Sequence, residues 1–598
     1  MCGIAGICRR DGRPIPENWV TLLDNSIKRR GPDAARRFHD QVGDTEVILL
    51  HRRLSIIDHA GGGQPMVSYA GESPDVAMVF NGCVYNNGQL RKELSNEGAV
   101  FASDHSDSET LFHAYTHWGE EMPSHIDGMY AVAFWDRRTL QLTLMRDPYG
   151  QKPLYVLHLG EAGDGCIFCS NPAPLQQIAR ELSLQQYSST ALQRYLQLGY
   201  MTDCDTLIQP VQSVQKARVL LKPTDESIEG AIRGSVIDHL ESDVPLGCFL
   251  SGGLDSSLIA TFAQQELGNL KTYCVKMDDP AYDESQYAKE VAKHLGTTHE
   301  TLRVSMDPAN DLLNLMGQLG QPFADSSILP TYWVSRAARE EVSVALSGDG
   351  GDELFLGYNR YLAIQTLARW HWLVARFPLQ GGTRPKTWLQ KLARMSSAAK
   401  DWSSFGVASI ASIFSRDEIE LLTGEPFVDP IVPLHGESSL SRLQQFDIEK
   451  YLEGDLLRKV DVASMYVALE VRCPLLSMRV RNAVSKLTTR ELISGGRKSV
   501  LKTIAKKYLP EQCVERPKMG FAVPLASWLR SDQSSLGQLA GDTLLCEDAF
   551  SGLNINKKFV ASMLHDHRSG RRNFEHKLFA LLTLALWAQQ PRTRVPAG

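Results

Sequence analysis

The chain has 598 residues, of which 43% are hydrophobic and 22% are charged. This composition is typical of soluble globular proteins, and the length predicts at least two domains. The 63 basic and 69 acidic residues leave a formal charge of −6. The overall balance therefore indicates no nucleic-acid partner and no attraction to an anionic membrane.

The cysteine content and the two chain ends indicate the cellular compartment. Eleven scattered cysteines and an N-terminal segment without the apolar core of a secretion signal predict a protein of the reducing cytoplasm. The apolar run at residues 578–588 is shorter than the ~18 residues of a membrane span. We expect a buried helix there and no membrane partner.

Cys2 follows the initiator methionine. If Met1 is removed, Cys2 carries a thiol beside a free α-amine, and an amine of pKa ~7.7–8.0 can act as the base for that thiol. Residues 3–7 form a strand-like run. The alternative is therefore that Cys2 is an ordinary residue at the start of a first strand.

Seven downstream motifs come in an order that resembles the glutaminase domain of class II glutamine amidotransferases. They are RRGPD (29–33), HRRLSIID (51–58), GGGQPM (61–66), NGCVYN (81–86), HSDSE (105–109), DGMYAVAFWD (127–136) and RDPYGQKPLY (146–155). The resemblance implies an Ntn-hydrolase fold, an αββα sandwich. Short alternating runs at 47–50, 76–80, 131–135 and 140–145 suit its strands.

The resemblance also assigns roles in glutamine hydrolysis. Cys2 would attack the carboxamide, while Asn81 and Gly82 hold the oxyanion. Arg53 would bind the α-carboxylate of glutamine and Asp107 its α-ammonium. The residues expected to bind glutamine are Arg53, Leu54, Ser55, Ile56, Ile57, Asn81, Gly82, Cys83 and Asp107.

Cys83 departs from the family pattern Asn-Gly-Glu-x-Tyr-Asn, in which a glutamate helps to hold the glutamine ammonium. Loss of that carboxylate could weaken glutamine binding by ~1–3 kcal/mol. Three alternatives follow: Asp107 suffices, another acid substitutes, or ammonia is the better nitrogen donor.

Cys166 and Cys169 form a C-x-x-C pair, a spacing found in metal and redox sites. The sequence has no second pair at matching spacing, and the pair lies in the alternating run CIFCS. We predict an ordinary edge strand.

A polar, proline-containing connection predicts the domain boundary. We expect a glutaminase domain at 2–210, a linker at 211–230 and an amide-forming domain at 231–590. In the last domain, strands at 244–250, 272–277, 300–304 and 342–346 alternate with helices at 255–266, 285–295 and 329–340. This alternation predicts a doubly wound parallel sheet, with ligands at the carboxyl ends of its strands and extra helices at 362–445.

The stretch SGGLDSS at 251–257 follows one such strand and opens a helix. Glycines at a strand-to-helix turn let backbone N–H groups approach an anion, although a tight turn alone would also require glycine. The stretch lacks the lysine of the GxxxxGK[ST] loop. It resembles the pyrophosphate loop of ATP pyrophosphatases, which release pyrophosphate while making acyl-adenylates.

A second glycine-rich loop, SGDGGDELFLGY at 347–358, also follows a strand. Acids beside a triphosphate require a cation, so we expect Mg²⁺ to bridge Asp255, Asp352 and the pyrophosphate. The alternative is a solvated acidic loop that caps a helix.

Two basic segments, GGRKSVLK (495–502) and RPKMGF (516–521), resemble family segments near the nucleotide. From them we choose Lys498 as the cation that neutralises charge on the phosphates. Lys502 and Lys518 have an equally good interpretation as surface charges. Residues 323–327 match a segment expected to line the acceptor side.

The whole chain is similar to the family of glutamine-hydrolysing asparagine synthetases. That similarity implies that a carboxylate, with aspartate as the expected acceptor, is activated by ATP and Mg²⁺ as an acyl-AMP and amidated by ammonia from glutamine. It implies the catalytic residues Cys2, Asn81, Gly82, Asp349 and Lys498. It places ATP at Leu250, Ser251, Gly252, Gly253, Asp255, Ser256, Val275, Ser347 and Gly348.

Three alternatives stay open at this point. The acceptor could be a sugar acid, a cell-wall acid or a natural-product acid. The enzyme could instead close a β-lactam or a lasso-peptide ring, although a cyclase has no use for the glutaminase residues. The third alternative is a non-enzymatic paralogue with a decayed glutaminase, and Cys83 is the only residue that suggests it. The sequence also leaves open whether the chain forms a homodimer.

Overall fold

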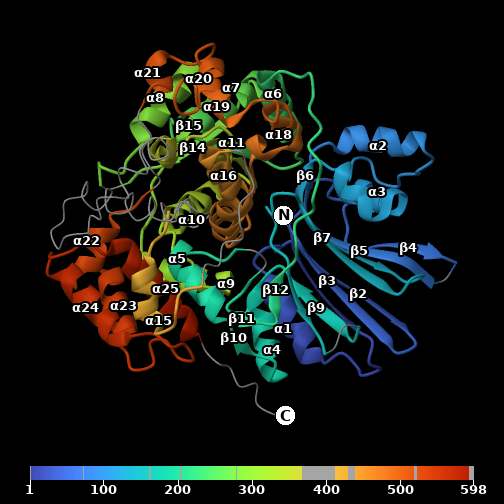
Figure 1. Cartoon of the computed structure of the whole chain (residues 1–598). Helices are drawn as coiled ribbons and strands as arrows, with labels where there is room; N and C mark the ends of the chain where they lie inside the picture. The colour runs from blue at the N-terminus through green and yellow to red at the C-terminus, as the bar shows by residue number, and fades with distance from the viewer. Residues whose placement is uncertain are drawn as a thin grey trace.

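The computed structural model describes residues 2–71, 73–160, 163–202, 205–277, 279–365, 411–428, 438–516 and 522–590. The N-terminal sheets lie on the right of Figure 1, and the chain from α6 (Ile228–Asp238) onward fills the top and the left. The N-terminus lies near the centre of the view, where these two parts of the chain meet (Figure 1).

The N-terminal part contains two antiparallel sheets. The six-stranded sheet has the order β12-β8-β9-β1-β3-β2, and the four-stranded sheet has the order β4-β5-β6-β7. Their strands are β1 (Gly3–Arg9), β2 (Ala34–Val42), β3 (Thr45–Arg53), β4 (Met66–Ala70), β5 (Ser73–Val84), β6 (Gly128–Asp136), β7 (Gln141–Arg146), β8 (Tyr155–His158), β9 (Gly165–Cys169) and β12 (Val211–Ser213).

Alternate side chains of the strands form three layers of core. Ala5 and Ile7 of β1 pack against α1 (Glu17–Ile27) and α4 (Pro172–Glu181), whereas Ile4 and Cys8 face the second sheet. The outer face of that second sheet is covered by α2 (Asn87–Asn96) and α3 (Asp107–Trp118). The predicted αββα sandwich is therefore confirmed.

One strand prediction is partly wrong. Cys166 and Cys169 do lie on a strand, β9, but it is an interior strand that pairs with β1 and β8. The edges of this sheet are β2 and β12, and β12 comes from the predicted linker. An edge strand cannot be recognised from local alternation, because the neighbours come from distant segments. The predicted domain boundaries stay a prediction.

The C-terminal part contains a five-stranded sheet in the order β15-β14-β13-β16-β17, and every pair is parallel. Helices α7 (Leu254–Leu267) and α8 (Ser285–Leu295) pack on one face, and α9 (Pro308–Leu319) and α10 (Ile328–Ala338) pack on the other. The doubly wound fold is confirmed. Its strands are β13 (Leu246–Phe249), β14 (Lys271–Val275), β15 (Thr298–Leu302), β16 (Val344–Leu346) and β17 (Glu470–Arg472).

Strand β13 lies between β14 and β16. From β13 the chain adds β14 and β15 on one side and then β16 and β17 on the other, so the strand order reverses at β13. Ligands of doubly wound sheets bind at this point, outside the carboxyl ends of the strands. Helix α9 and strand β17 were not predicted. A three-residue strand that joins the sheet from so far along the chain carries no distinct local pattern.

Further helices pack beside this sheet, against α9 or against one another. They are α5 (Ser189–Leu198), α11 (Gly351–Leu354), α15 (Arg416–Thr423), α16 (Ser439–Phe446), α17 (Arg458–Met465), α18 (Met478–Val484), α19 (Thr489–Leu492), α20 (Ser499–Ala505), α21 (Glu511–Val514), α22 (Leu525–Arg530), α23 (Ser535–Leu544), α24 (Lys557–Arg568) and α25 (Glu575–Ala588). Much of the predicted helical stretch 362–445 lies outside the described residues. The apolar α25 is buried, as predicted, and within the described ranges no helix is long and apolar enough to cross a membrane.

Candidate functional site

A small pocket of about 30 Å³ lies where the two parts of the chain meet. The predicted glutamine-binding residues line it, except Ser55 and Asn81. Its lining is Cys2, Arg53, Leu54, Ile56, Ile57, Gly62, Gln64, Phe80, Gly82, Cys83, Asp107, Ser108, Glu470 and Arg472. This space holds a few water molecules at most, so a glutamine molecule has to move part of the wall outward.

Strand pairing brings the predicted nucleophile and its partners together. Gly3 pairs with Arg52 across β1 and β3, which places Cys2 beside Arg53. The amide of Cys2 donates a hydrogen bond of 2.9 Å to Oδ1 of Asn81. Burial raises the pKa of the Cys2 thiol, so the thiol is protonated at rest and requires a base before it can attack.

Asn81 offers a free donor next to Cys2. Its Nδ2 is buried and has no hydrogen-bond partner among the described residues. A buried donor without a partner is costly, and an oxyanion formed on Cys2 would satisfy it. Gly82 must be glycine, because a Cβ there would lie 2.0 Å from the carbonyl oxygen of Met129.

Arg53 and Asp107 hold opposite charges in this pocket. The Arg53 guanidinium donates to the carbonyls of Ile57, Asp58 and His59. Asp107 begins α3, and its Oδ2 accepts the amide of Val84 at 3.2 Å. Burial raises the pKa of Asp107 to about 6. An ammonium group bound beside Asp107 would therefore stabilise its charged form.

Cys83 is buried in the pocket, and burial raises the pKa of its thiol well above the ordinary value. Carboxylates of Asp107, Glu470 and Glu241 surround it closely enough to add to this rise. Glu470 forms a 2.7 Å ion pair with Arg472. Both residues come from β17 and were not predicted for this pocket, because only the packing of the two parts of the chain brings them there.

Strand β17 separates the small pocket from a larger cavity. The side chains of Glu470 and Arg472 line the small pocket, whereas Val471 between them lines the cavity. Successive side chains of a strand point to opposite faces. A single strand is therefore a shared wall of the two sites.

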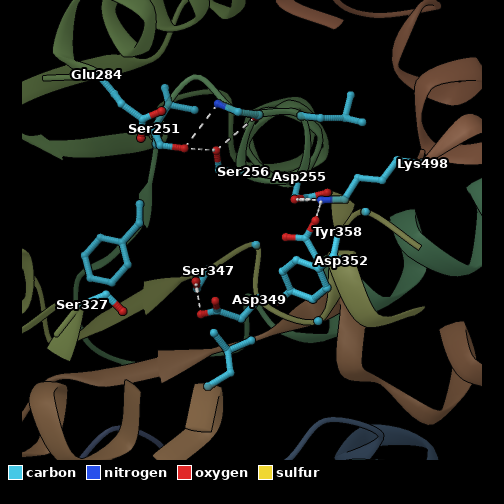
Figure 2. Close-up of a pocket in the computed structure, with 18 of the residues that line it drawn as sticks. Ser251, Asp255, Ser256, Glu284, Ser327, Ser347, Asp349, Asp352, Tyr358 and Lys498 are labelled. Atoms are coloured by element: carbon cyan, nitrogen blue, oxygen red, sulfur yellow. Dashed lines mark hydrogen bonds and ion pairs between the residues drawn. The ribbon is translucent and has the colours of Figure 1, made fainter. Parts of the chain in front are cut away.

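The larger cavity has a volume of about 750 Å³ and lies at the carboxyl ends of β13, β14 and β16. All predicted nucleotide-binding residues except Gly252 line it, as do Asp349, Asp352 and Lys498. Figure 2 shows Ser251 with Ser256, Asp255 with Lys498 and Asp352, and Ser347 with Asp349 as three groups around this space.

The SGGLDSS turn has the geometry of an anion site. Gly252 has φ +72°, and a Cβ there would lie 2.8 Å from the backbone of Tyr287. The hydroxyl of Ser251 accepts the amide of Gly253 at 3.3 Å and lies 3.2 Å from the hydroxyl of Ser256. Because the 14-residue helix α7 begins here, its N-terminal N–H groups and its dipole favour a phosphate.

Lys498 joins the two predicted metal ligands. Its ammonium contacts the carboxylate of Asp255 and lies 2.8 Å from that of Asp352 (Figure 2). Burial would lower the pKa of Lys498, but these two carboxylates raise it. Its backbone is left-handed, with φ +54°, an uncommon conformation for lysine.

The carboxylate pair also fits a magnesium ion. Asp255 and Asp352 offer hard oxygen ligands that one cation already bridges. Within the described ranges, no group of three or more His, Cys, Asp or Glu could hold a metal ion. Magnesium at this pair would therefore take its other ligands from phosphate oxygens and water.

The far end of the cavity carries a second set of charged residues. Asp325 and Ser327, predicted for the acceptor side, line it together with Lys459. Nζ of Lys459 lies 2.7 Å from Asp325 and 2.8 Å from the hydroxyl of Ser327. Burial would raise the pKa of Asp325, but Lys459 lowers it to about 2. No sequence motif identified Lys459.

The remaining predicted lysines differ in their placement. Lys502 lines the cavity and forms a 2.6 Å ion pair with Glu515. Lys518 lies outside the described residues.

Two family profiles cover nearly the whole sequence. The profile "Asparagine synthase" matches residues 227–589, and the profile "Glutamine amidotransferase domain" matches residues 1–230. The residues that line both pockets lie within these two matched ranges.

Curated relatives match over similar lengths. Asparagine synthetase [glutamine-hydrolyzing] 1 of Bacillus subtilis is 30% identical, with 98% of this chain and 96% of that protein aligned. A putative asparagine synthetase [glutamine-hydrolyzing] of Mycobacterium tuberculosis is also 30% identical, over 98% of this chain and 97% of that protein. Asparagine synthetase [glutamine-hydrolyzing] 3 of Bacillus subtilis is 26% identical, over 87% and 86%.

Proposed function

The chain belongs to the asparagine synthase family and is an enzyme like the glutamine-hydrolysing asparagine synthetases, and from this premise we propose that its acceptor is L-aspartate. The family uses ATP. In the proposed reaction, ATP activates the side-chain carboxylate of aspartate as an acyl-AMP. Ammonia from glutamine then displaces AMP, and the products are asparagine, AMP, pyrophosphate and glutamate.

The small pocket would perform the glutaminase half-reaction. Once Met1 is removed, the α-amine of Cys2 takes the proton from its thiol, and the thiolate attacks the carboxamide. The protonated amine then gives its proton to the leaving nitrogen, the C–N bond breaks to release ammonia, and water hydrolyses the remaining thioester to glutamate. Nδ2 of Asn81 and the amide of Gly82 stabilise the oxyanion. Arg53 and Asp107 bind the charged groups at the other end of glutamine.

The large cavity would perform the synthetase half-reaction. An oxygen of the acceptor carboxylate attacks the α-phosphorus of ATP, and pyrophosphate leaves from the N-terminus of α7. Lys498 neutralises charge that grows on the phosphates. Asp349, held by Ser347 at 2.7 Å, accepts the proton from the attacking nitrogen. Magnesium bound by Asp255 and Asp352 would supply further positive charge.

The names of the relatives support aspartate as the acceptor, and the shared wall is the observation that supports coupling of the two half-reactions. Because β17 lines both sites, ammonia formed at Cys2 would have to pass only this shared wall to reach the acyl-adenylate. An ammonia molecule that left for bulk water would be protonated and would lose its nucleophilicity. A buried path between the sites avoids that loss.

The test is pyrophosphate release from ATP, Mg²⁺ and glutamine, measured with and without aspartate while asparagine is followed by mass. Pyrophosphate that depends on aspartate and equals asparagine would support the proposal. Absence of a response from protein that still binds ATP would exclude aspartate.

A second candidate is the same chemistry on a larger carboxylate. The 750 Å³ cavity with Lys459, Asp325 and Ser327 at one end favours it. The same assay with sugar acids and other carboxylates distinguishes the two candidates. A ring-closing enzyme is disfavoured, because an intramolecular amine would leave Cys2 and its pocket without a role.

A further inference from the structure

Asp243 lies just before β13 and bonds to the N-terminal part of the chain at three places. Its amide donates to the carbonyl of Ile56 at 2.9 Å. Its Oδ2 accepts the amide of Asp58 at 2.7 Å and lies 2.8 Å from Nε2 of His105. One residue of the amide-forming domain therefore holds two separate segments of the other domain.

The first segment is the turn that fixes Arg53. The Arg53 guanidinium donates to the carbonyls of Ile57, Asp58 and His59 at 3.2, 2.7 and 3.0 Å. Asp243 bonds to the backbone of the same turn, at Ile56 and Asp58. The position of Arg53 therefore depends on the anchor that Asp243 provides.

The second segment carries Asp107, two residues after His105. The carbonyl of His105 accepts Nδ2 of Asn87 at 2.9 Å, and the same Nδ2 donates to Glu241 at 3.2 Å. Glu241 and Asp243 thus connect the start of the C-terminal sheet to the segment that presents Asp107.

The strength of this anchor comes from its backbone bonds. The side chains of Asp243 and His105 are each 37% exposed, and an ion pair so accessible to water contributes little alone. A carboxylate that accepts a backbone amide makes a charge-assisted bond, which is stronger. Val244 and Leu246, which follow Asp243, pack against a buried cluster that contains Leu54, Ile56 and Ile57.

We propose that Asp243 is a positioning residue for glutamine, which keeps the segments carrying Arg53 and Asp107 in register with each other. The inference rests on the proposed glutaminase role of the small pocket. That pocket encloses about 30 Å³, so part of its wall has to move outward when glutamine enters. A shared anchor maintains the spacing between the cation and the carboxylate that bind the two ends of the ligand.

The test compares Asp243→Ala with Asp243→Asn and with a control, Glu226→Gln. Glu226 forms a 2.7 Å, partly exposed ion pair with Arg479 and does not line the pocket. For Asp243→Ala we expect KM for glutamine to rise ~10-fold or more in the hydrolysis assay, with kcat within ~2-fold of wild type. Asp243→Asn, which can still accept the amide of Asp58, should show a smaller rise.

Further measurements separate positioning from unfolding. Ammonium-dependent synthesis and Tm should stay near wild type in each variant. His105→Ala should raise KM less than Asp243→Ala does, because the backbone bonds of Asp243 remain, and it should add little to Asp243→Ala, because both changes remove the same contact. Glu226→Gln should keep the wild-type KM.

Two outcomes would overturn the inference. One is a wild-type KM for glutamine in folded Asp243→Ala, and the other is an equal loss of kcat and of ammonium-dependent synthesis. A failure of the proposed function looks different: wild-type protein would not hydrolyse glutamine, or Cys2→Ala would hydrolyse it normally.

Discussion

The small pocket and the large cavity differ in size and in the origin of their walls. The pocket encloses about 30 Å³, and its walls come from both parts of the chain. The cavity encloses about 750 Å³, and most of its residues surround one end of a single parallel sheet. A pocket for one small ligand is defined by a few polar groups. A cavity for a nucleotide and an acceptor is larger than the part that its nucleotide-binding groups define, so those groups do not identify the acceptor.

The carboxylates of the two sites also differ. In the cavity, Asp325 and the Asp255–Asp352 pair each face a lysine. In the pocket, burial raises the pKa of Asp107 to about 6. The cavity is thus organised as charge pairs, whereas the pocket has a carboxylate that is ready to bind a ligand cation.

The largest expected effect removes the activity of the small pocket and leaves that of the large cavity. Cys2→Ala should lower glutamine-dependent synthesis by ~10³-fold or more, because the nucleophile is lost. Ammonium-dependent synthesis should continue, since the cavity is unchanged. Parallel assays with glutamine and with ammonium check this. Equal survival of both activities would mean that Cys2 is not the nucleophile.

The second-largest effect should lower glutamine-dependent and ammonium-dependent synthesis together. Lys498→Met should lower pyrophosphate release by ~10²-fold or more with either nitrogen donor, because it removes the cation at the phosphates. Lys502→Met is the matched control, since Lys502 lines the same cavity but pairs with Glu515. Pyrophosphate release is the readout. Comparable losses in the two variants would refute the role of Lys498.

A moderate effect should depend on pH and appear only in the pocket. The pKa of Asp107 is raised to about 6, so its carboxylate is protonated as the pH falls below that value. Glutamine requires the charged form, so KM should rise by up to ~10-fold per pH unit below this point. Glutamine hydrolysis at pH 5 to 8 measures it. A constant KM in that range would exclude Asp107 as the ammonium ligand.

The smallest expected effect concerns Cys83. Glu470 already places a carboxylate close to Cys83, so the thiol need not contribute to ammonium binding. Cys83→Ala should change KM for glutamine by less than ~2-fold. Steady-state hydrolysis checks this. A tenfold rise would show that the thiol itself binds the ligand.

Features that lie close together in the sequence could be predicted. The strands with clear alternation, the helix Ser285–Leu295 and the SGGLDSS turn all follow from neighbouring residues. The predicted residues of HRRLSIID and NGCVYN meet near Cys2 because β1 pairs with β3 and because β3 packs against β5 of the second sheet. Family resemblance supplied the roles that residue types alone could not.

Contacts between distant segments could not be predicted. Glu470 and Arg472 reach the small pocket through the packing of β17, and Lys459 reaches Asp325 from α17. The interior position of β9 depends on β12, which pairs with β8. Each of these features depends on long-range packing, which leaves no periodic signal in the local sequence.

If ammonia passes from the small pocket to the cavity across β17, nitrogen from glutamine should reach the product without mixing with ammonia in solution. The enzyme is supplied with ATP, Mg²⁺, aspartate, amide-¹⁵N glutamine and an equal concentration of unlabelled ammonium, and the product amide is analysed by mass. We expect the product amide to carry ¹⁵N almost undiluted and to equal glutamate and AMP in amount. A product labelled in proportion to free ammonium would contradict it.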